Sequence, residues 1–131
     1  MILVDTSVWI DYFKGLDTQE TNLLDLALGK NDVAIGDLIL LEILQGFRAD
    51  KDYKTAKEHL LALHQFNMLT TDLALIAAEN YRELRKHGIT IRKSADVIIA
   101  TFCIENQLPL LFADRDFIPF TQHLALQSVT N

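Results

Sequence analysis

The chain contains little cysteine, proline or glycine and no long apolar run. Its 131 residues include one cysteine, Cys103, two prolines and five glycines. A single cysteine excludes an internal disulfide framework and a cysteine-rich zinc module, and it suits a reducing cytoplasm. The longest apolar stretches, 38–41 and 97–104, are far shorter than the ~20 residues that span a bilayer. Residues 1–5 lack a basic segment, so we expect no signal peptide.

An overall basic charge, which nucleic-acid binding favours, is also missing, because the net charge is −6. The charges are distributed unevenly: residues 1–47 sum to −6, residues 48–93 to +3 and residues 94–131 to −3. Half of the residues (50%) are hydrophobic and 23% are charged, which predicts a folded chain rather than a disordered one. The length predicts one domain over residues 1–131.

Short apolar runs alternate with segments of helical periodicity. Strands are predicted at 1–4, 32–35, 67–69 and 110–112, with a last one near 125–127. Helices are predicted at 6–13, 18–28, 36–46, 51–66, 73–87 and 95–106, with a short helical piece after Asp116 and with Asp72 and Ser94 as N-caps. Continuously apolar strands are typical of a sheet covered on both faces, so we expect a compact α/β sandwich with a mostly parallel sheet.

Acidic residues follow the first and the fourth predicted strands. Asp5 and Asp114 stand directly after these strands. Each alone could be a helix cap or part of a turn, but the carboxyl ends of parallel strands meet at one sheet edge, where such folds bind ligands. We therefore expect the two side chains to lie near each other.

Two further acids stand in apolar surroundings. Glu42 lies in Leu38-Ile-Leu-Leu-Glu42-Ile-Leu44, and a buried unpaired carboxylate is costly, so it must pair, take up a proton or bind a metal. Alternatively, Glu42 faces a narrow solvent stripe or pairs with Arg48. Asp96 precedes the apolar run Val97-Ile-Ile-Ala100, and its alternative role is a favourable interaction with a helix N-terminus.

Four neighbouring carboxylates, with Asp116 as a further candidate, would repel one another unless a cation lay between them. Oxygen ligands of this kind favour Mg²⁺ or Mn²⁺, one or two ions, and such sites act on phosphate esters. The sequence contains no phosphate-binding Gly-Lys loop and no Gly-x-Ser-x-Gly motif. Its histidines have no ligand spacing, and we interpret them as surface or half-buried residues; they are His59, His64, His87 and His123.

Four segments follow one another in a specific order over almost the whole chain. They are Val4-Asp-Thr-Ser-Val-Trp9, Glu42-Ile-Leu-Gln-Gly46, Lys93-Ser-Ala-Asp96-Val-Ile-Ile-Ala100 and Leu111-Phe-Ala-Asp-Arg-Asp-Phe117. Together they resemble the PIN-domain family, and most closely the VapC-like toxins of bacterial toxin–antitoxin pairs. The resemblance implies a three-layer α/β/α sandwich with four or five strands, and a Mg²⁺- or Mn²⁺-dependent endoribonuclease.

The resemblance also assigns roles to residues. It implies metal binding and catalysis by Asp5, Glu42, Asp96 and Asp114, with Asp116 as a further ligand and Thr6 or Ser7 orienting the Asp5 loop. Many family members carry Thr, His or Asn before the fourth acid, where this chain has Phe112-Ala113. We hypothesise that metal-activated water attacks an RNA phosphodiester in line, leaving 5′-phosphate and 3′-hydroxyl ends.

Basic residues in the middle of the chain are candidates for RNA binding. They are Arg82, Arg85, Lys86, Arg92 and Lys93. The last two stand just before Asp96, where they could steer RNA into an acidic groove. The alternative is a solvated helix face with pairs such as Glu79–Arg82 and Glu83–Lys86. Arg48 could serve the rim of the site or cap the helix that carries Glu42.

Apolar side chains near the N-terminus could bind a partner or fill the core. The resemblance implies a small antitoxin whose helix lies in an apolar groove, and it also implies a homodimer. The candidate contact residues are Trp9, Tyr12, Phe13 and Leu41.

Other functions fit the sequence less well. A haloacid-dehalogenase-type phosphatase needs a second Asp at position 7, where this chain has Ser7. A receiver-type domain needs paired acids near the N-terminus and an Asp after a middle strand. Two alternatives within the family stay open: a catalytically silent module that only binds its partner, and a nuclease for RNA maturation.

Overall fold

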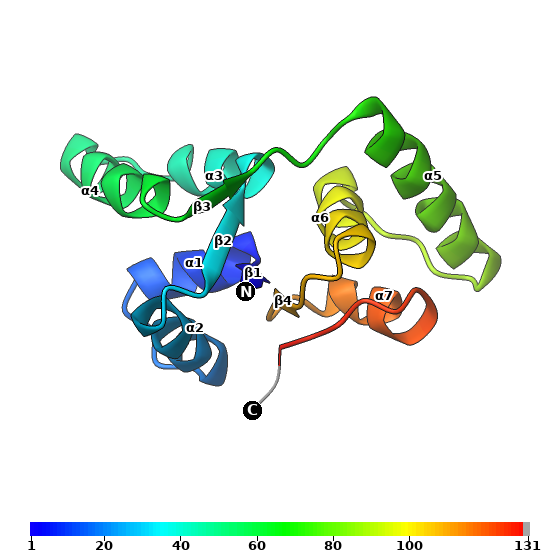
Figure 1. Cartoon of the computed structure of the whole chain (residues 1–131), viewed down its shortest axis with the longest axis horizontal. Coiled ribbons are helices and arrows are strands. Elements are labelled where there is room, and N and C mark those ends of the chain that lie inside the picture. Colours follow the sequence, from blue (N-terminus) through cyan, green and yellow to red (C-terminus); the bar gives the residue numbers. More distant parts are fainter. Residues whose placement is uncertain (130–131) are drawn as a thin grey trace.

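A parallel four-stranded sheet forms the centre of the computed structural model, which describes residues 1–129 (Figure 1). The strands are β1 (Ile2–Val4), β2 (Val33–Gly36), β3 (His64–Phe66) and β4 (Leu110–Leu111). Their order is β3-β2-β1-β4, and every neighbouring pair is parallel. Leu3 pairs with Ala34 on one side and with Leu110 on the other. The mostly parallel sheet predicted from the sequence is confirmed.

Helices lie on both sides of this sheet, which gives the expected three layers (Figure 1). One group is formed by α1 (Thr6–Phe13), α2 (Gln19–Gly29), α3 (Asp37–Leu44) and α4 (Asp50–Leu61). The other is formed by α5 (Thr71–Lys86), α6 (Ser94–Glu105), the short 3-10 helix η1 (Arg115–Phe117) and α7 (Ile118–His123). Over residues 1–129, no helix is long and apolar enough to cross a membrane.

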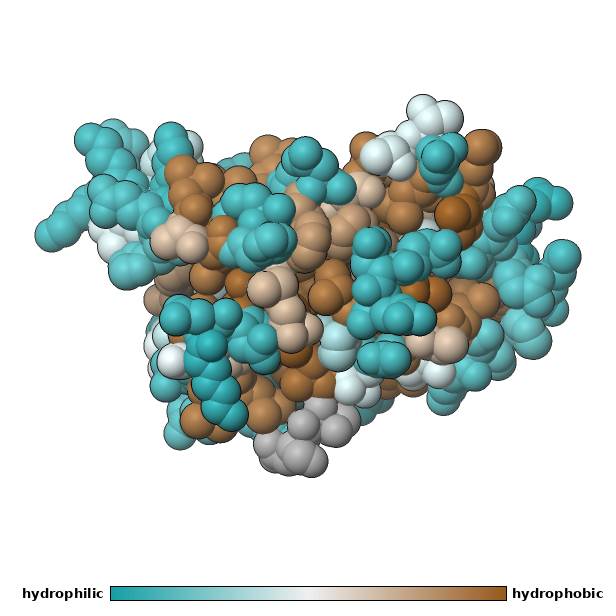
Figure 2. Space-filling view, in the orientation of Figure 1, coloured by the Kyte–Doolittle hydropathy of each residue, from teal (hydrophilic) through white to brown (hydrophobic). Residues whose placement is uncertain are grey.

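The central strands are apolar on both faces because helices cover both. Leu3, Ala34 and Leu110 are each 0% exposed. Hydrophilic residues gather over the outer helices at the two sides of the molecule, whereas apolar residues occupy much of the middle of the visible face (Figure 2). The edge strand β3 is different, because His64 and Gln65 are exposed.

The predicted helix 51–66 and the predicted strand 67–69 are both wrong in their bounds. Helix α4 ends at Leu61, and His64–Phe66 form the strand β3. The side-chain amide of Gln65 donates to the carbonyl oxygens of Leu60 and Leu63, at 2.8 and 3.0 Å, and so stabilises the end of the helix. An edge strand with one covered face carries polar residues, so its sequence did not show the apolar run expected of a strand.

Both predicted N-caps are displaced. The cap of α5 is Thr70, whose hydroxyl accepts a hydrogen bond from the Leu73 N–H at 3.1 Å, whereas Asp72 lies inside the first turn. Helix α6 begins at Ser94 itself, with Lys93 as a cap that makes no side-chain bond. The strand predicted near 125–127 is reduced to a single bridge between Leu110 and Ser128.

Candidate active site and metal centre

Two adjacent strands bring the first and last predicted acids to one edge of the sheet. Val4 pairs with Leu111, so the residues that follow β1 and β4 leave the sheet at the same level. The Asp5 N–H donates to the Leu111 carbonyl at 2.9 Å, which fixes the start of the Asp5 segment against the end of β4. Asp114 follows three residues later, as the N-cap of η1.

Three of the predicted carboxylates form a tight group. One oxygen each of Asp96, Asp114 and Asp116 lies within 4.8 Å of the others. Asp114 Oδ1 accepts a hydrogen bond from the Asp116 N–H at 2.9 Å, so the backbone of η1 holds two of these side chains together. Asp96 enters from the first turn of α6 and is only 6% exposed.

Two oxygen atoms of this group lack hydrogen-bond donors within the described residues. Among residues 1–129, Asp96 Oδ2 and Asp116 Oδ2 are buried and accept no hydrogen bond. A buried carboxylate oxygen without a donor is costly, and a cation held between such oxygens would remove that cost. The three-acid group therefore fits a divalent cation with oxygen ligands.

Asp5 is a helix cap, and its charge also acts on Asp96 of the acidic group. It is 4% exposed, and its Oδ2 accepts hydrogen bonds from Ser7 Oγ at 2.9 Å and, at 3.5 Å, from the Ser7 N–H. Burial raises the pKa of Asp5; the hydrogen bonds from Ser7 oppose that shift, and the charge of Glu42 adds to it. The cap role that the sequence left as an alternative thus coexists with a place in the site.

Glu42 is tied to the segment after β1. Thr6 Oγ1 donates to Glu42 Oε1 at 2.8 Å, which joins α3 to the first turn of α1. Glu42 is half-buried, and the structure forms no Glu42–Arg48 ion pair within the described residues. Thr6 was predicted to orient the Asp5 loop, and its bond to Glu42 was not predicted, because no local pattern reveals a partner 36 positions away.

Electrostatic coupling joins Asp96 to the other acids. Burial, followed by the charges of Asp5, Asp114 and Glu42, raises the pKa of Asp96 to about 7, while Lys93 opposes the shift. The group within 4.8 Å thus contains Asp96, Asp114 and Asp116, whereas Asp5 and Glu42 lie outside it and are linked to Asp96 through their charges. The apolar Phe112, whose ring lies 5.4 Å from that of Phe117, supplies no polar group there, so the backbone N–H of Asp116 supports Asp114 instead.

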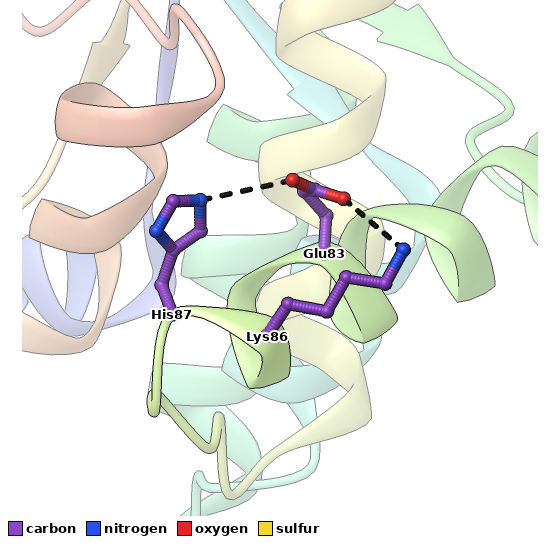
Figure 3. A network of polar contacts seen from close by, with 3 residues as sticks. All are labelled: Glu83, Lys86 and His87. Carbon is purple, nitrogen blue, oxygen red and sulfur yellow. Dashed lines mark ion pairs between the residues drawn. The ribbon is translucent and has the colours of Figure 1, made fainter.

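The predicted RNA-binding cations fall into two sets. Arg92 and Lys93 lie at the acidic site, with Arg92 Nη2 3.6 Å from Asp116 Oδ2. The others, Arg82, Arg85 and Lys86, line a separate pocket of about 280 Å³ on α5. Of the ion pairs expected for a solvated helix face, Glu83–Lys86 is present, with Lys86 Nζ 3.7 Å from Glu83 Oε2 (Figure 3). His87 Nε2 also lies 3.7 Å from Glu83 Oε1.

Of the apolar residues predicted to bind a partner, some lie in the core and some at the surface. Trp9 is 2% exposed and stacks on Phe13, with ring centroids 5.8 Å apart, so it belongs to the core, as the alternative expected. Tyr12 and Phe13 are half-buried, and Leu41 is 58% exposed.

A pocket of about 600 Å³ lies between α1, α3 and α4. Phe13 lines it, together with Ile10 and Phe47, which were not among the predicted residues. The signal that could have found Ile10 is its spacing of three from Phe13 on one helix face.

This chain is an α/β protein with an all-parallel sheet. Its acidic side chains lie at the carboxyl ends of two adjacent strands, so it belongs to the class of such proteins that have a carboxylate centre. The model of the PIN domain family matches residues 2–120. The chain therefore belongs to the PIN domain family.

Curated relatives match almost end to end. Ribonuclease VapC11 of Mycobacterium tuberculosis and VapC ribonuclease Mb1587 of Mycobacterium bovis are each 28% identical to this chain over 134 residues, which cover 99% of this chain and 98% of theirs.

Solved structures share the fold. VapBC2 from Rickettsia felis, bound to a promoter DNA fragment, has a TM-score of 0.77 and 19% identity, with 98% of both chains covered. FitAcB from Neisseria gonorrhoeae has a TM-score of 0.72 and 20% identity, covering 99% of this chain and 97% of that one. A toxin–antitoxin complex from Klebsiella pneumoniae has a TM-score of 0.70 and 21% identity, with the same coverage.

Proposed function

We propose that this chain is a divalent-metal-dependent endoribonuclease and the toxin of a VapBC-type pair. The observation that carries the proposal is the buried Asp96 carboxylate, whose Oδ2 has no donor within residues 1–129 and faces a group of further acids. The names of the relatives, VapC ribonucleases, point to RNA as the substrate. We place the activity in the cytoplasm.

Asp96, Asp114 and Asp116 would hold Mg²⁺ or Mn²⁺, with Asp5 and Glu42 completing the site. When bound, the ion would supply Lewis-acid activation of water and of the phosphate. The chain itself contributes orientation: Ser7 fixes the Asp5 carboxylate and Thr6 fixes that of Glu42. Attack by water, rather than by the 2′-hydroxyl, would leave 5′-phosphate and 3′-hydroxyl ends.

The first test is cleavage of a mixed RNA pool by the purified chain with Mg²⁺ or Mn²⁺. We expect cleavage that EDTA abolishes and that Asp96→Asn reduces by at least about 100-fold, because the variant removes a charged ligand. Asp72→Asn, on the exposed first turn of α5, is the matched control and should cleave normally.

Three results would contradict parts of this proposal. Equal cleavage by Asp96→Asn would remove the support for the site. Products ending in a 2′,3′-cyclic phosphate would exclude water as the nucleophile. A folded, metal-binding chain that cuts no RNA in the pool would favour the catalytically silent alternative.

We also propose a small antitoxin as partner, with the pocket between α1, α3 and α4 as its docking site. Exposed Ile10 and half-buried Phe13 and Phe47 offer an apolar lining, to which Arg48 and Asp52 add charged side chains. Such a groove suits an amphipathic helix. Phe47→Glu should abolish co-purification with the product of a small reading frame next to the gene, whereas Lys57→Glu on the exposed side of α4 should not.

Detection of this complex would also distinguish a toxin from a maturation enzyme, because a maturation enzyme needs no neighbouring antitoxin gene.

We further propose that the chain forms a homodimer. Light scattering of the purified chain at several concentrations measures this directly, and a monomer at all concentrations would contradict it.

A further inference from the structure

One cation of this chain reaches the acidic site from its rim. Arg92 belongs to the segment between α5 and α6, and its Nη2 lies 3.6 Å from Asp116 Oδ2. That distance is too long for a hydrogen bond, so the contact is a charge attraction alone. Over residues 1–129 the same Asp116 oxygen accepts no hydrogen bond.

The two partners are held very differently. Asp116 is 26% exposed, and its backbone is fixed by the bond from its N–H to Asp114 Oδ1. The Arg92 side chain is 81% exposed, although the preceding residue, Ile91, is anchored in the core at 6% exposure. The chain next to Arg92 is anchored and the Arg92 head group is solvated. The guanidinium can therefore change its position while remaining near the acidic group.

A divalent ion would compete with Arg92 for the same carboxylate. Asp116 belongs to the three acids that fit such an ion. Exposed ion pairs are weak, so a doubly charged ion with several oxygen ligands would displace the guanidinium. The displaced group would then stand beside the ion, where a substrate phosphate must lie. Arginine binds phosphate through two parallel hydrogen bonds, and this suits it to that position.

We propose that Arg92 has two positions: it is the counter-ion of Asp116 in the metal-free chain, and it binds an RNA phosphate once metal takes that carboxylate. This inference rests on the proposed function, since it needs both a metal and a phosphate ester. It makes Arg92 a substrate-binding residue whose availability depends on the metal. The charge of the neighbouring Lys93 instead lowers the pKa of Asp96, and Lys93 makes no ion pair with Asp116 within the described residues.

The counter-ion role is tested by Mn²⁺ titration without RNA, using calorimetry. We expect Arg92→Gln to bind Mn²⁺ about two- to fivefold more tightly, the range set by a weak ion pair. Lys57→Gln, at an exposed position on α4, controls for the general loss of one positive charge. In an Asp116→Asn background, Arg92→Gln should have no more effect than Lys57→Gln. An Arg92→Gln effect of the same size in both backgrounds, or one no larger than that of Lys57→Gln, would overturn the counter-ion role.

The phosphate-binding role is tested with a labelled 20-nucleotide poly(U), using fluorescence anisotropy with and without Mn²⁺ and checking by gel that the RNA is intact. Arg92→Gln should weaken binding about three- to tenfold with Mn²⁺ and little without it. Lys93→Gln should weaken binding to a similar degree in both conditions. An Arg92→Gln loss that is independent of Mn²⁺ would overturn the switch. Failure of the unaltered chain to bind any RNA would instead count against the proposed function, and the metal titration would still decide the counter-ion role.

Discussion

At the scale of single residues, the surroundings of Asp96 disfavour its ionised carboxylate, and the proposed metal binding would account for its presence there. Asp96 is 6% exposed, and burial together with the charges of Asp5 and Asp114 raises the pKa of its carboxyl to about 7 from the ordinary 3.8. Between these two values the folded chain binds more protons than the unfolded chain, so stability falls as pH rises. Above about pH 7 both states are ionised and the full penalty is present.

Asparagine at this position should therefore stabilise the metal-free chain. We expect Asp96→Asn to raise the free energy of unfolding by on the order of 2–4 kcal/mol at pH 8, and by less at pH 5. Denaturant unfolding with EDTA at both pH values measures the difference. Asp72→Asn is the matched control. A stabilisation that does not grow between pH 5 and pH 8 would contradict the raised pKa.

Thr6 offers a second test at this scale, because its hydroxyl donates to Glu42 Oε1 at 2.8 Å. We expect Thr6→Val to cost about 1 kcal/mol of stability and to weaken Mn²⁺ binding, since Glu42 loses the group that orients it. Thr6→Ser keeps the hydroxyl and should preserve both properties. Calorimetry with Mn²⁺ compares the two variants, and equal affinities would show that this bond does not position Glu42.

At the scale of elements, the turn from β2 into α3 places Glu42. Gly36 ends β2 and precedes α3, and a Cβ at this position would collide with the Met68 side chain at its Sδ atom. Asp37 Oδ1 accepts hydrogen bonds from Leu38 N–H and Met68 N–H, at 2.8 and 3.1 Å. Met68 is 1% exposed, so the turn and the segment after β3 are packed as one unit.

Alanine at Gly36 should disturb this unit. We expect Gly36→Ala to cost about 1–3 kcal/mol, because Met68 must move within a filled core. Gly29→Ala is the control: apart from the neighbouring residues and the backbone of its own helix, no heavy atom lies within 4 Å of the added Cβ, and alanine favours the helix, so it should be neutral or slightly stabilising. Thermal unfolding of the two variants tests this, and equal melting temperatures would contradict it.

Elements with strong local signals could be predicted from the sequence, and those set by their neighbours could not. Helix α1 has the predicted bounds because Asp5 caps it and Gly15, with φ +74, follows its end. The strand β3 was misplaced because the periodicity of α4 continues past Leu61, and the amide of Gln65, which stabilises the helix end, gives no local signal.

At the scale of the whole molecule, the strand order β3-β2-β1-β4 decides the site. It places β4, the last strand in the chain, next to β1, the first, and so brings Asp114 to Asp5. The sequence predicted that acids after parallel strands meet at one edge. It could not predict which strands are neighbours or that Asp116 Oδ2 would face Arg92, because both depend on packing between distant segments.

The fold as a whole therefore holds several acids together, and the proposed cation would remove the cost of their repulsion. Saturating Mn²⁺ at 100 times its dissociation constant should stabilise the folded chain by about 2.7 kcal/mol, which corresponds to a melting temperature roughly 8–13 °C higher for a chain of this size. Asp96→Asn should begin from a higher melting temperature without metal and gain little from Mn²⁺, so the curves of the two proteins should approach each other as Mn²⁺ rises. Scanning calorimetry over a Mn²⁺ series measures both. Parallel increases in the unaltered chain and in Asp96→Asn would mean that the ion binds elsewhere, and that the repulsion among the acids is relieved by some means other than a metal.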